Sequence, residues 1–200
     1  MQVTLLHYTP LTICSNAIRT CWQSFDKSDD GGEKDRDLID RVGNKFKHAS
    51  TLEHLHYNFY IKGISRALLQ ELARHRMASL SVKSTRYTLK ELKECEKIDY
   101  EKFLVLTNND SVDNASKAAL DNLQNILQSG VSNDVAKYCL PESYKTELTW
   151  SINARSLQNF LYLRSDKAAL WEIRNLAYTI FKTLPDEHKY IFENHVKEEK

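Results

Sequence analysis

The chain has 200 residues, of which 42% are hydrophobic, and a formal net charge of +1. This is enough for one sizeable core, and no linker rich in proline, glycine or serine divides the sequence, so a single domain over residues 1–200 is predicted. The near-neutral charge argues against a protein that binds nucleic acids or membrane surfaces in general, and any basic site must be local. No apolar run approaches the roughly 18 to 20 residues that span a bilayer.

The beginning of the chain predicts a strand followed by a helix. Residues 2–8 alternate in polarity as a strand does, and Thr9 and Pro10 are expected to cap and begin the helix. Cys14 and Cys21 both fall on the apolar stripe of that helix, so both are predicted to be buried. The four cysteines lack C-x-x-C spacing, and the first residues lack a basic region, which favours the reducing cytoplasm.

Further elements are predicted between residues 33 and 73. A second helix carries Phe46 on its apolar stripe, and residues 54–62 alternate as a strand with one apolar face. Ser65 is expected to cap a third helix. His48, His54 and His56 lie close in sequence, but no set of ligands with zinc spacing surrounds them, so no metal site is predicted.

The second half of the chain predicts longer elements. Residues 112–128 form a strongly periodic helix, and residues 144–152 alternate as a strand. Asn153 is a favourable N-cap for a helix that follows the strand. Ser165 and Asp166 are expected to cap the beginning of the last long helix.

The basic stretch 74–87 is the most distinctive part of the sequence. It holds three arginines, one lysine, one histidine and three serines directly after a predicted helix. A second polar cluster places Arg155 and Asn159 on one helix face, four residues apart. Forked guanidinium groups, hydroxyls and backbone N–H groups are typical of phosphate recognition, although solvated or ion-paired arginines would give the same composition. The two clusters predict a phosphorylated ligand.

Other features restrict how that ligand is bound. Neither of the nucleotide-binding motifs G-x-G-x-x-G and G-x-x-x-x-G-K-[ST] occurs, and the whole chain has only five glycines. The backbone therefore cannot wrap closely around a pyrophosphate, and side chains must bind the ligand. Arg164 lies half a helical turn away from the face of Arg155. It can therefore join the same site only if the helix ends near it or if a neighbouring subunit brings the faces together.

These motifs resemble the signature of the flavin-dependent thymidylate synthases. Arg74-His75-Arg76, seven residues and then Ser84-Thr85-Arg86-Tyr87 match that signature. The resemblance continues in the segments His48-x-Ser50-x-x-Glu53-His54, Lys137-x-x-Leu140-Pro141 and Asn153-Ala-Arg155-Ser-Leu-x-Asn159-Phe-x-x-x-Arg164. It therefore spans most of the chain.

The resemblance implies a fold and an activity. The implied fold is α+β, a single domain with a central, mostly antiparallel sheet flanked by long helices, assembled as a homotetramer whose active sites combine residues of several subunits. The implied reaction is a methyl transfer that converts deoxyuridine monophosphate (dUMP) to thymidylate (dTMP). In it 5,10-methylenetetrahydrofolate donates the carbon, FAD carries the hydride and NADPH is the reductant. Neither a nucleic acid nor a membrane is implied as a partner.

The resemblance also implies the site residues, with no metal among the ligands. The expected FAD contacts are Ser50, Arg74, His75, Arg76, Asn153, Ala154, Arg155 and Asn159, with His48 and Glu53 as further residues near the flavin. The expected dUMP contacts are Glu71, Leu72, Ala73, Arg74, Val82, Lys83, Ser84, Thr85, Arg86, Lys137 and Arg164. Departures from the pattern common in the family occur at Glu71, Ser81, Val82, Thr85, Lys137 and Ala168.

Arg164 is the predicted catalytic residue. A guanidinium stays protonated at working pH, so beside the uracil ring it would favour the N3-deprotonated form and make C5 more nucleophilic. No cysteine nucleophile is expected, because Cys95 and Cys139 lack a His/Asn setting that would activate a thiol. Ser84 has no adjacent base, and it is expected to bind the nucleotide rather than to attack it.

Two other functions fit parts of the sequence. One is an RNA-binding module that uses residues 74–86, which the near-neutral charge and the absence of an RRM or KH signature oppose. The other is a different FAD- or nucleotide-binding enzyme with a similar anion site. A colourless purified protein that also takes up no FAD would contradict the synthase.

Overall fold

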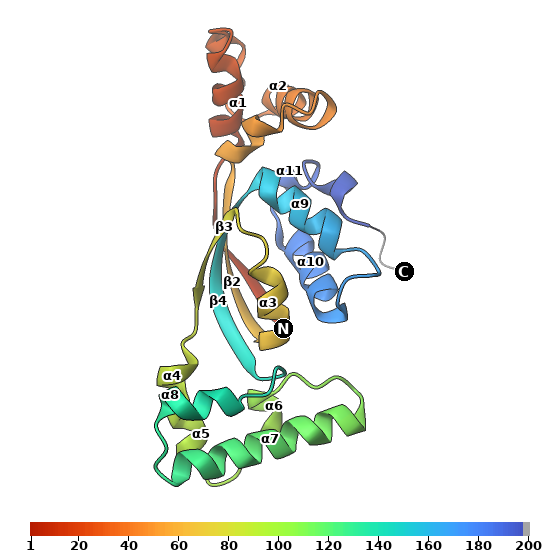
Figure 1. Ribbon diagram of the computed structural model, residues 1–200. Coiled ribbons are helices and arrows are strands. Elements are labelled where there is room, and N and C mark those ends of the chain that lie inside the picture. The colour runs from red at the N-terminus through yellow and green to blue at the C-terminus, as the bar shows by residue number, and fades with distance from the viewer. Residues whose placement is uncertain (198–200) are drawn as a thin grey trace.

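The computed structural model describes residues 1–197, and a four-stranded sheet runs through the middle of this part of the chain (Figure 1). Its strands, in spatial order, are β1 (Gln2–Tyr8), β2 (His56–Ser65), β4 (Lys145–Asn153) and β3 (Ala78–Val82). Every neighbouring pair is antiparallel. The predicted class, a mixed fold with a central antiparallel sheet, is confirmed.

The sheet has one apolar and one polar face because its two central strands alternate in sequence. Tyr57 and Phe59 of β2 and Trp150 of β4 are fully buried on one face. On the other face the hydroxyl of Tyr60 donates to Glu147 at 2.6 Å. The apolar face is the side on which helices pack.

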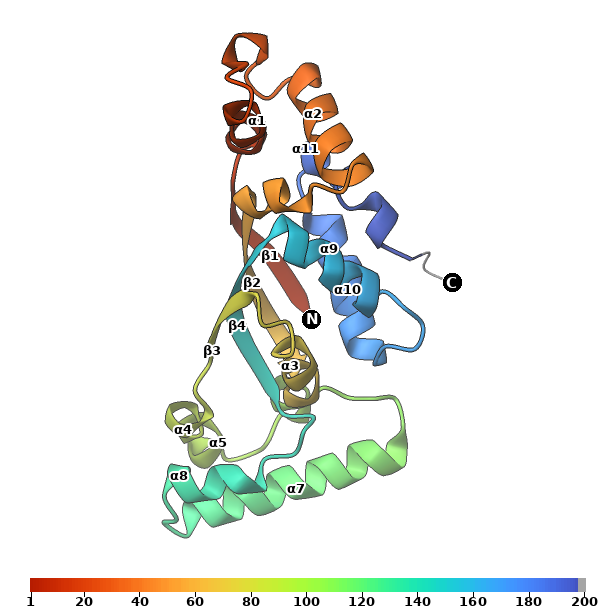
Figure 2. The same ribbon diagram turned by 45° about the horizontal axis from the view of Figure 1, so that its top comes forward.

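Three helices cover that apolar face, as both ribbon views show (Figures 1 and 2). They are α3 (Arg66–Leu72), α9 (Ala154–Arg164) and α10 (Trp171–Thr183). Phe160 of α9 meets the ring of Trp150 edge-to-face, with ring centroids 5.0 Å apart. The opposite face of α9 therefore points away from the sheet and is free to form a site.

Further short helices lie above the upper end of the sheet or beside it in Figure 1. They comprise α1 (Leu11–Thr20), 3₁₀ turns at Phe25–Lys27, Ala49–His54 and Glu193–His195, α2 (Glu33–Ile39), a π-helical turn at Asp40–Lys45 and α11 (Asp186–Lys189). A buried ion pair between Arg19 and Asp35, 2.6 Å long, joins α1 to α2. Serine hydroxyls and a backbone N–H also donate to Asp35, which holds the pKa of its carboxyl at about 2 despite burial.

The stretch 83–144 forms a helical lobe at the lower end of the molecule in Figure 1. It contains α4 (Thr85–Thr88), α5 (Lys90–Glu94), α6 (Tyr100–Phe103), α7 (Asp110–Gln128), α8 (Asn133–Ala136) and a 3₁₀ turn at Lys137–Cys139. Leu92, Phe103 and Leu123 belong to an apolar cluster of this lobe that is separate from the cluster on the sheet. The described residues thus have two apolar clusters where one core was expected, and the single domain stays a prediction.

Several predicted boundaries differ from the structure near the beginning of the chain. Pro10 is the N-cap and the helix begins at Leu11, one residue later than expected. Cys21 is exposed because α1 ends at Thr20, one residue before it. Phe46 is 63% exposed, since the π-helical turn rotates the chain away from the apolar face of α2.

Two further predictions concern segments around the site. Strand β3 was not predicted, because its alternation of Ala78, Leu80 and Val82 with serines is hidden inside the basic stretch. Ser165 does not cap the last helix: its buried hydroxyl donates to the carbonyl of Leu161, and α10 begins only at Trp171. The caps at Ser65 and Asn153 are confirmed, with Ser65 Oγ 3.0 Å from the N–H of Leu68.

Within residues 1–197 no helix combines the length and the apolar character that crossing a bilayer requires.

Candidate functional site

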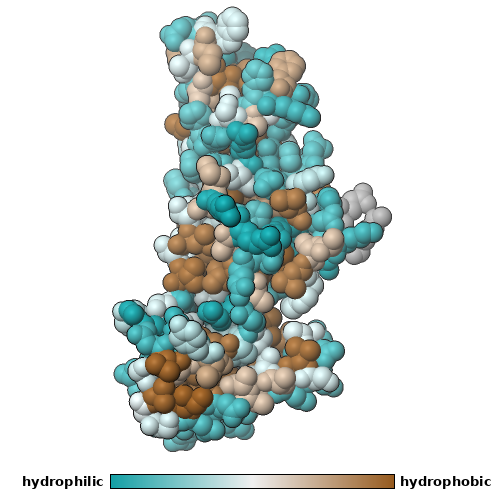
Figure 3. Space-filling model, in the orientation of Figure 1, coloured by the Kyte–Doolittle hydropathy of each residue, from teal (hydrophilic) through white to brown (hydrophobic). Residues whose placement is uncertain are grey.

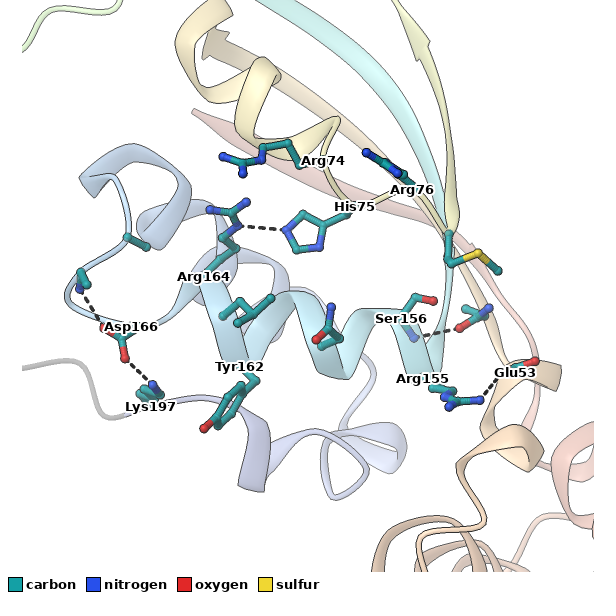
Figure 4. Close-up of a pocket in the computed structure, with 16 residues that line it drawn as sticks. Glu53, Arg74, His75, Arg76, Arg155, Ser156, Tyr162, Arg164, Asp166 and Lys197 are labelled. Carbon is teal, nitrogen blue, oxygen red and sulfur yellow. Dashed lines mark hydrogen bonds and ion pairs between the residues drawn. The ribbon is translucent and has the colours of Figure 1, made fainter.

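A cavity of about 850 Å³ extends along the outer face of α9 (Figure 4). The turn between α3 and β3, which carries Arg74, His75 and Arg76, forms one side of it. Glu53 and Lys197 lie on the other side of the helix. The volume is in the range of sites that bind small molecules and cofactors.

Local sequence explains why α9 presents polar groups to the cavity. Asn153 is its N-cap, and the side chain of Asn153 accepts a hydrogen bond of 2.9 Å from the N–H of Ser156. Leu157, Phe160 and Leu161 face the sheet and are buried. Arg155, Asn159 and Tyr162, spaced by four and three residues, follow one stripe on the opposite face and line the cavity.

Arg164 is held in a fixed orientation at the end of α9. Its Nη1 lies 2.8 Å from a carboxylate oxygen of Glu71 and its Nη2 3.2 Å from the Glu71 carbonyl. Its Nε lies 2.9 Å from Nε2 of His75. Because α9 ends at this residue, Arg164 reaches the cavity of Arg155 within one chain, which fulfils the first of the two conditions predicted from the sequence.

His75 takes part in this arrangement as a neutral ring. Burial and the positive charge of Arg164 lower its pKa to about 4, so Nε2 can accept the hydrogen bond that Arg164 donates. The ring of His75 stands edge-on to Phe160, with centroids 5.0 Å apart. The same phenylalanine packs on Trp150, so the sheet, α9 and His75 are in contact.

Positive charge prevails in the cavity. Its lining includes the cations Arg74, Arg76, Arg155, Arg164 and Lys197 and the carboxylates Glu53 and Asp166. Arg155 is paired with Glu53 at 2.7 Å, and the largely exposed Arg74 is 3.5 Å from Glu71. Guanidinium groups around a space of this size suit an anionic ligand such as a phosphorylated cofactor.

The structure places other predicted residues away from this cavity. Val82 to Arg86 lie where β3 enters the helical lobe, and the exposed Lys137 lies on its 3₁₀ turn. Lys83 is 3.2 Å from Glu147, and Arg86 is 3.6 Å from Asp134. One chain thus brings together only part of the predicted nucleotide contacts.

Residues near the cavity also differ from the predicted set. His48 is the N-cap of the 3₁₀ turn that carries Glu53, and Ser50 lies within that turn; both are exposed, but neither lines the cavity. Leu72 and Ala154 are buried, and Ala73 is exposed outside the lining. The lining residues that the sequence did not predict are Met77, Ser156, Tyr162, Leu163, Asp166, Ala168, Ala169 and Lys197.

The cysteines lie outside the cavity. Burial raises the pKa of the Cys14 thiol to about 12, so this group is a poor nucleophile. Cys139 is exposed on the helical lobe, and Cys95 there is half-buried. In the described part of the chain no three histidine, cysteine or acidic side chains are grouped as a metal site, and the absence of a bound metal stays a prediction.

The fold and the cavity define an α+β protein with a largely cationic cavity on the outer face of a sheet-covering helix. Comparison with known proteins agrees with this class. The model of the family "Thymidylate synthase complementing protein" matches residues 4–188, so the chain belongs to this family.

Individual relatives are similar over nearly the whole chain. A flavin-dependent thymidylate synthase of Campylobacter jejuni (strain RM1221) is 70% identical over 200 residues, 97% of both chains. The flavin-dependent thymidylate synthase of Helicobacter pylori (strain 26695) is 58% identical, over 98% of this chain and 100% of its own. A crystal structure of flavin dependent thymidylate synthase ThyX from Helicobacter pylori, complexed with FAD and dUMP, matches with a TM-score of 0.94 at 58% identity, over 98% of this chain and 100% of that one.

Proposed function

We propose that this chain is a flavin-dependent thymidylate synthase, which converts dUMP to dTMP. The observation that carries the proposal is the orientation of Arg164 by Glu71 and a neutral His75 at the end of a cationic cavity. The relatives with this name, and the solved complex of one of them with FAD and dUMP, support the same activity here. 5,10-Methylenetetrahydrofolate and NADPH complete the proposed reaction.

FAD is the proposed cofactor of the cavity on α9. Arg74, Arg76 and Arg155 offer guanidinium donors to the cofactor, and Asn159 offers an amide on the same helix face as Arg155. When bound, FAD would supply the hydride that reduces the transferred carbon. Asn153, through its side chain, both caps α9 and borders the space in which the cofactor would lie.

Arg164 is the proposed catalytic residue. Its guanidinium is directed by three hydrogen bonds, stays protonated, and can stabilise negative charge on the uracil ring. A ring that has lost its N3 proton carries more electron density at C5, the carbon that receives the methyl group. This mechanism needs no cysteine, in keeping with the position of all four thiols outside the cavity lining.

A homotetramer with shared sites is the proposed assembly. The predicted nucleotide contacts from Val82 to Arg86 and Lys137 lie away from the cavity of their own chain, so a neighbouring chain would bring them to it. Exposed apolar and aromatic side chains support association: Met77, Tyr87, Val135 and Tyr138 are each more than half exposed. Figure 3 shows apolar surface gathered over the helical lobe.

The proposed location of the enzyme is the cytoplasm, and the four free cysteines agree with its reducing conditions.

The purified protein tests this proposal directly. We expect a yellow protein that releases FAD on denaturation and forms dTMP from dUMP only when 5,10-methylenetetrahydrofolate and NADPH are present. Light scattering is expected to give the mass of four chains. A colourless protein that also takes up no added FAD would contradict the proposal.

A further inference from the structure

The C-terminal segment contributes a cation to the wall of the cavity. The backbone N–H of Lys197 donates to the buried hydroxyl of Ser165 at 2.9 Å, which fixes the segment against the end of α9. The ammonium group of Lys197 then pairs with Asp166 and lies 4.7 Å from the centroid of the Tyr162 ring. Figure 4 shows these three side chains together, below α9. Lys197 lies beyond residue 188, where the match to the family model ends.

Tyr162 connects this group to the proposed FAD residues. It follows Arg155 by seven residues and Asn159 by three, so the three side chains share one stripe along roughly 10 Å of helix. Its ring is 51% exposed and lines the cavity. An exposed ring beside a fixed ammonium group offers a stacking surface and a positive charge at the same place.

We propose that Tyr162 and Lys197 form a further part of the FAD site, in which the tyrosine ring stacks on a planar ring of the cofactor and the ammonium group pairs with its phosphates. This inference rests on the proposed function. A dinucleotide is the class of ligand that carries both groups, and its length suits a stripe that runs along two turns of α9.

The pair with Asp166 allows the role of Lys197 to be separated from a structural one. If the pair only anchors the C-terminal segment, loss of either partner has the same effect on the site. If Lys197 acts on the phosphates, neutralising Asp166 removes a negative charge from the wall and leaves the cation in place. Loss of the two partners then has opposite effects on an anionic ligand.

Titration of flavin-free protein with FAD, followed by the quenching of flavin fluorescence, measures these effects without turnover. We expect Tyr162→Ala to weaken FAD binding about tenfold, the effect of losing one stacked ring, and Tyr162→Phe to bind as the wild type does. Lys197→Met is expected to weaken binding several-fold, and Lys197→Arg to restore it. Asp166→Asn is expected to bind FAD as tightly as the wild type or more tightly.

Lys189→Met is the matched control, because Lys189 forms a comparable pair with Asp186 on α11, outside the cavity. It is expected to leave the dissociation constant for FAD unchanged. Equal weakening by Lys197→Met and Asp166→Asn would overturn the inference, as would unchanged binding in both Tyr162→Ala and Lys197→Met. Far-UV circular dichroism confirms that each variant is folded.

The same titration separates failure of the inference from failure of the proposed function. A wild-type protein that binds FAD while the Tyr162 and Lys197 variants bind it equally well contradicts only the inference. A wild-type protein that binds no FAD contradicts the proposed function itself.

Discussion

Arg164 is preorganised before any substrate arrives. Glu71 holds one arm of the charged guanidinium in an ion pair, and the neutral ring of His75 accepts a hydrogen bond from Nε without competing for a proton. The side chain of Arg164 is only 17% exposed, so its guanidinium group cannot rotate freely toward water. A guanidinium whose orientation is fixed in advance costs little reorganisation when charge develops on a bound ring.

Replacing Arg164 tests this role. We expect Arg164→Ala to lower kcat for dTMP formation by about 100-fold or more, the effect of losing one group that stabilises developing charge. Reduction of bound FAD by NADPH, measured by the loss of flavin absorbance, is expected to persist at least in part. Arg36→Ala, an exposed arginine on α2, serves as the control. A kcat near that of the wild type in Arg164→Ala would show that the uracil ring binds elsewhere.

His188 is expected to make stability depend on pH. It is buried, it shares a 2.7 Å hydrogen bond with the hydroxyl of Tyr57, and burial lowers its pKa from 6.5 to about 4. Between these two pKa values the unfolded chain binds the proton and the folded chain does not. The contribution of His188 to stability is therefore fully present above pH ~6.5 and is lost as the pH falls toward 4. The shift in pKa corresponds to about 3 kcal/mol of unfolding free energy.

Urea unfolding at pH 7 and pH 4.5 measures this loss. The wild type is expected to lose more free energy of unfolding between the two pH values than His188→Gln, whose side chain does not titrate. Each protein is compared with itself, so a general destabilisation by the substitution does not affect the result. An equal loss in both proteins would assign the pH dependence to other groups, among them His75.

Helix α9 combines a structural and a functional task at its first turn. Asn153 caps the helix and also lines the cavity. We expect Asn153→Ala to lower the free energy of unfolding of the flavin-free protein by about 1 kcal/mol, the usual cost of losing a cap. Asn153→Ser keeps a capping oxygen on a shorter side chain, so it is expected to recover most of the stability but not the affinity for FAD.

Stability by urea unfolding and affinity by FAD titration are the two measurements for these variants. If Asn153→Ser restores both to the level of the wild type, the asparagine amide has no part in binding the cofactor. If it restores neither, the serine hydroxyl does not replace the cap.

The sequence predicted the elements whose pattern is local. Strand β4 alternates strictly, and Asn153 follows it as a cap, so both were found with small errors at the ends. Strand β3 was not predicted, because its polar positions are serines in a stretch whose basic residues are typical of a ligand-binding loop. The last long helix was predicted to begin too early in the sequence, at Ser165 and Asp166. A Ser-Asp pair resembles an N-cap in sequence, but here the serine hydroxyl donates to the carbonyl of Leu161 instead.

The site was predictable only where it follows a motif. Arg155 and Asn159 are four residues apart, so helical spacing alone puts them on one face. The contacts of Arg164 with Glu71 and His75 cross 93 and 89 positions of sequence and depend on packing. Lys197 belongs to no motif, and its contact with Tyr162 arises only from the path of the C-terminal segment.

The whole molecule is divided between two apolar clusters. Leu123 on α7 is fully buried in the cluster of the helical lobe, and Leu176 on α10 is fully buried in the cluster on the sheet. Separate clusters allow separate opening, because few buried contacts couple one part to the other. The nucleotide contacts predicted at residues 82–86 lie at the entry to the lobe and would move with it.

Hydrogen exchange distinguishes the two clusters. Either Leu123→Ala or Leu176→Ala removes a buried side chain, at a cost of about 2–5 kcal/mol. We expect Leu123→Ala to accelerate exchange mainly in α5, α7 and α8, and Leu176→Ala mainly in the sheet and α9. Uniform acceleration in both variants would show that the molecule opens as a single unit.

The position of the helical lobe also bears on the order in which the chain folds. Strand β3 leaves the ribosome long before β4, its neighbour in the sheet, because residues 83–144 come between them. Joining the two strands directly would require closure of a long loop. If the lobe forms first, it brings the end of β3 close to the beginning of β4, and a slow encounter between distant segments becomes a rapid local pairing.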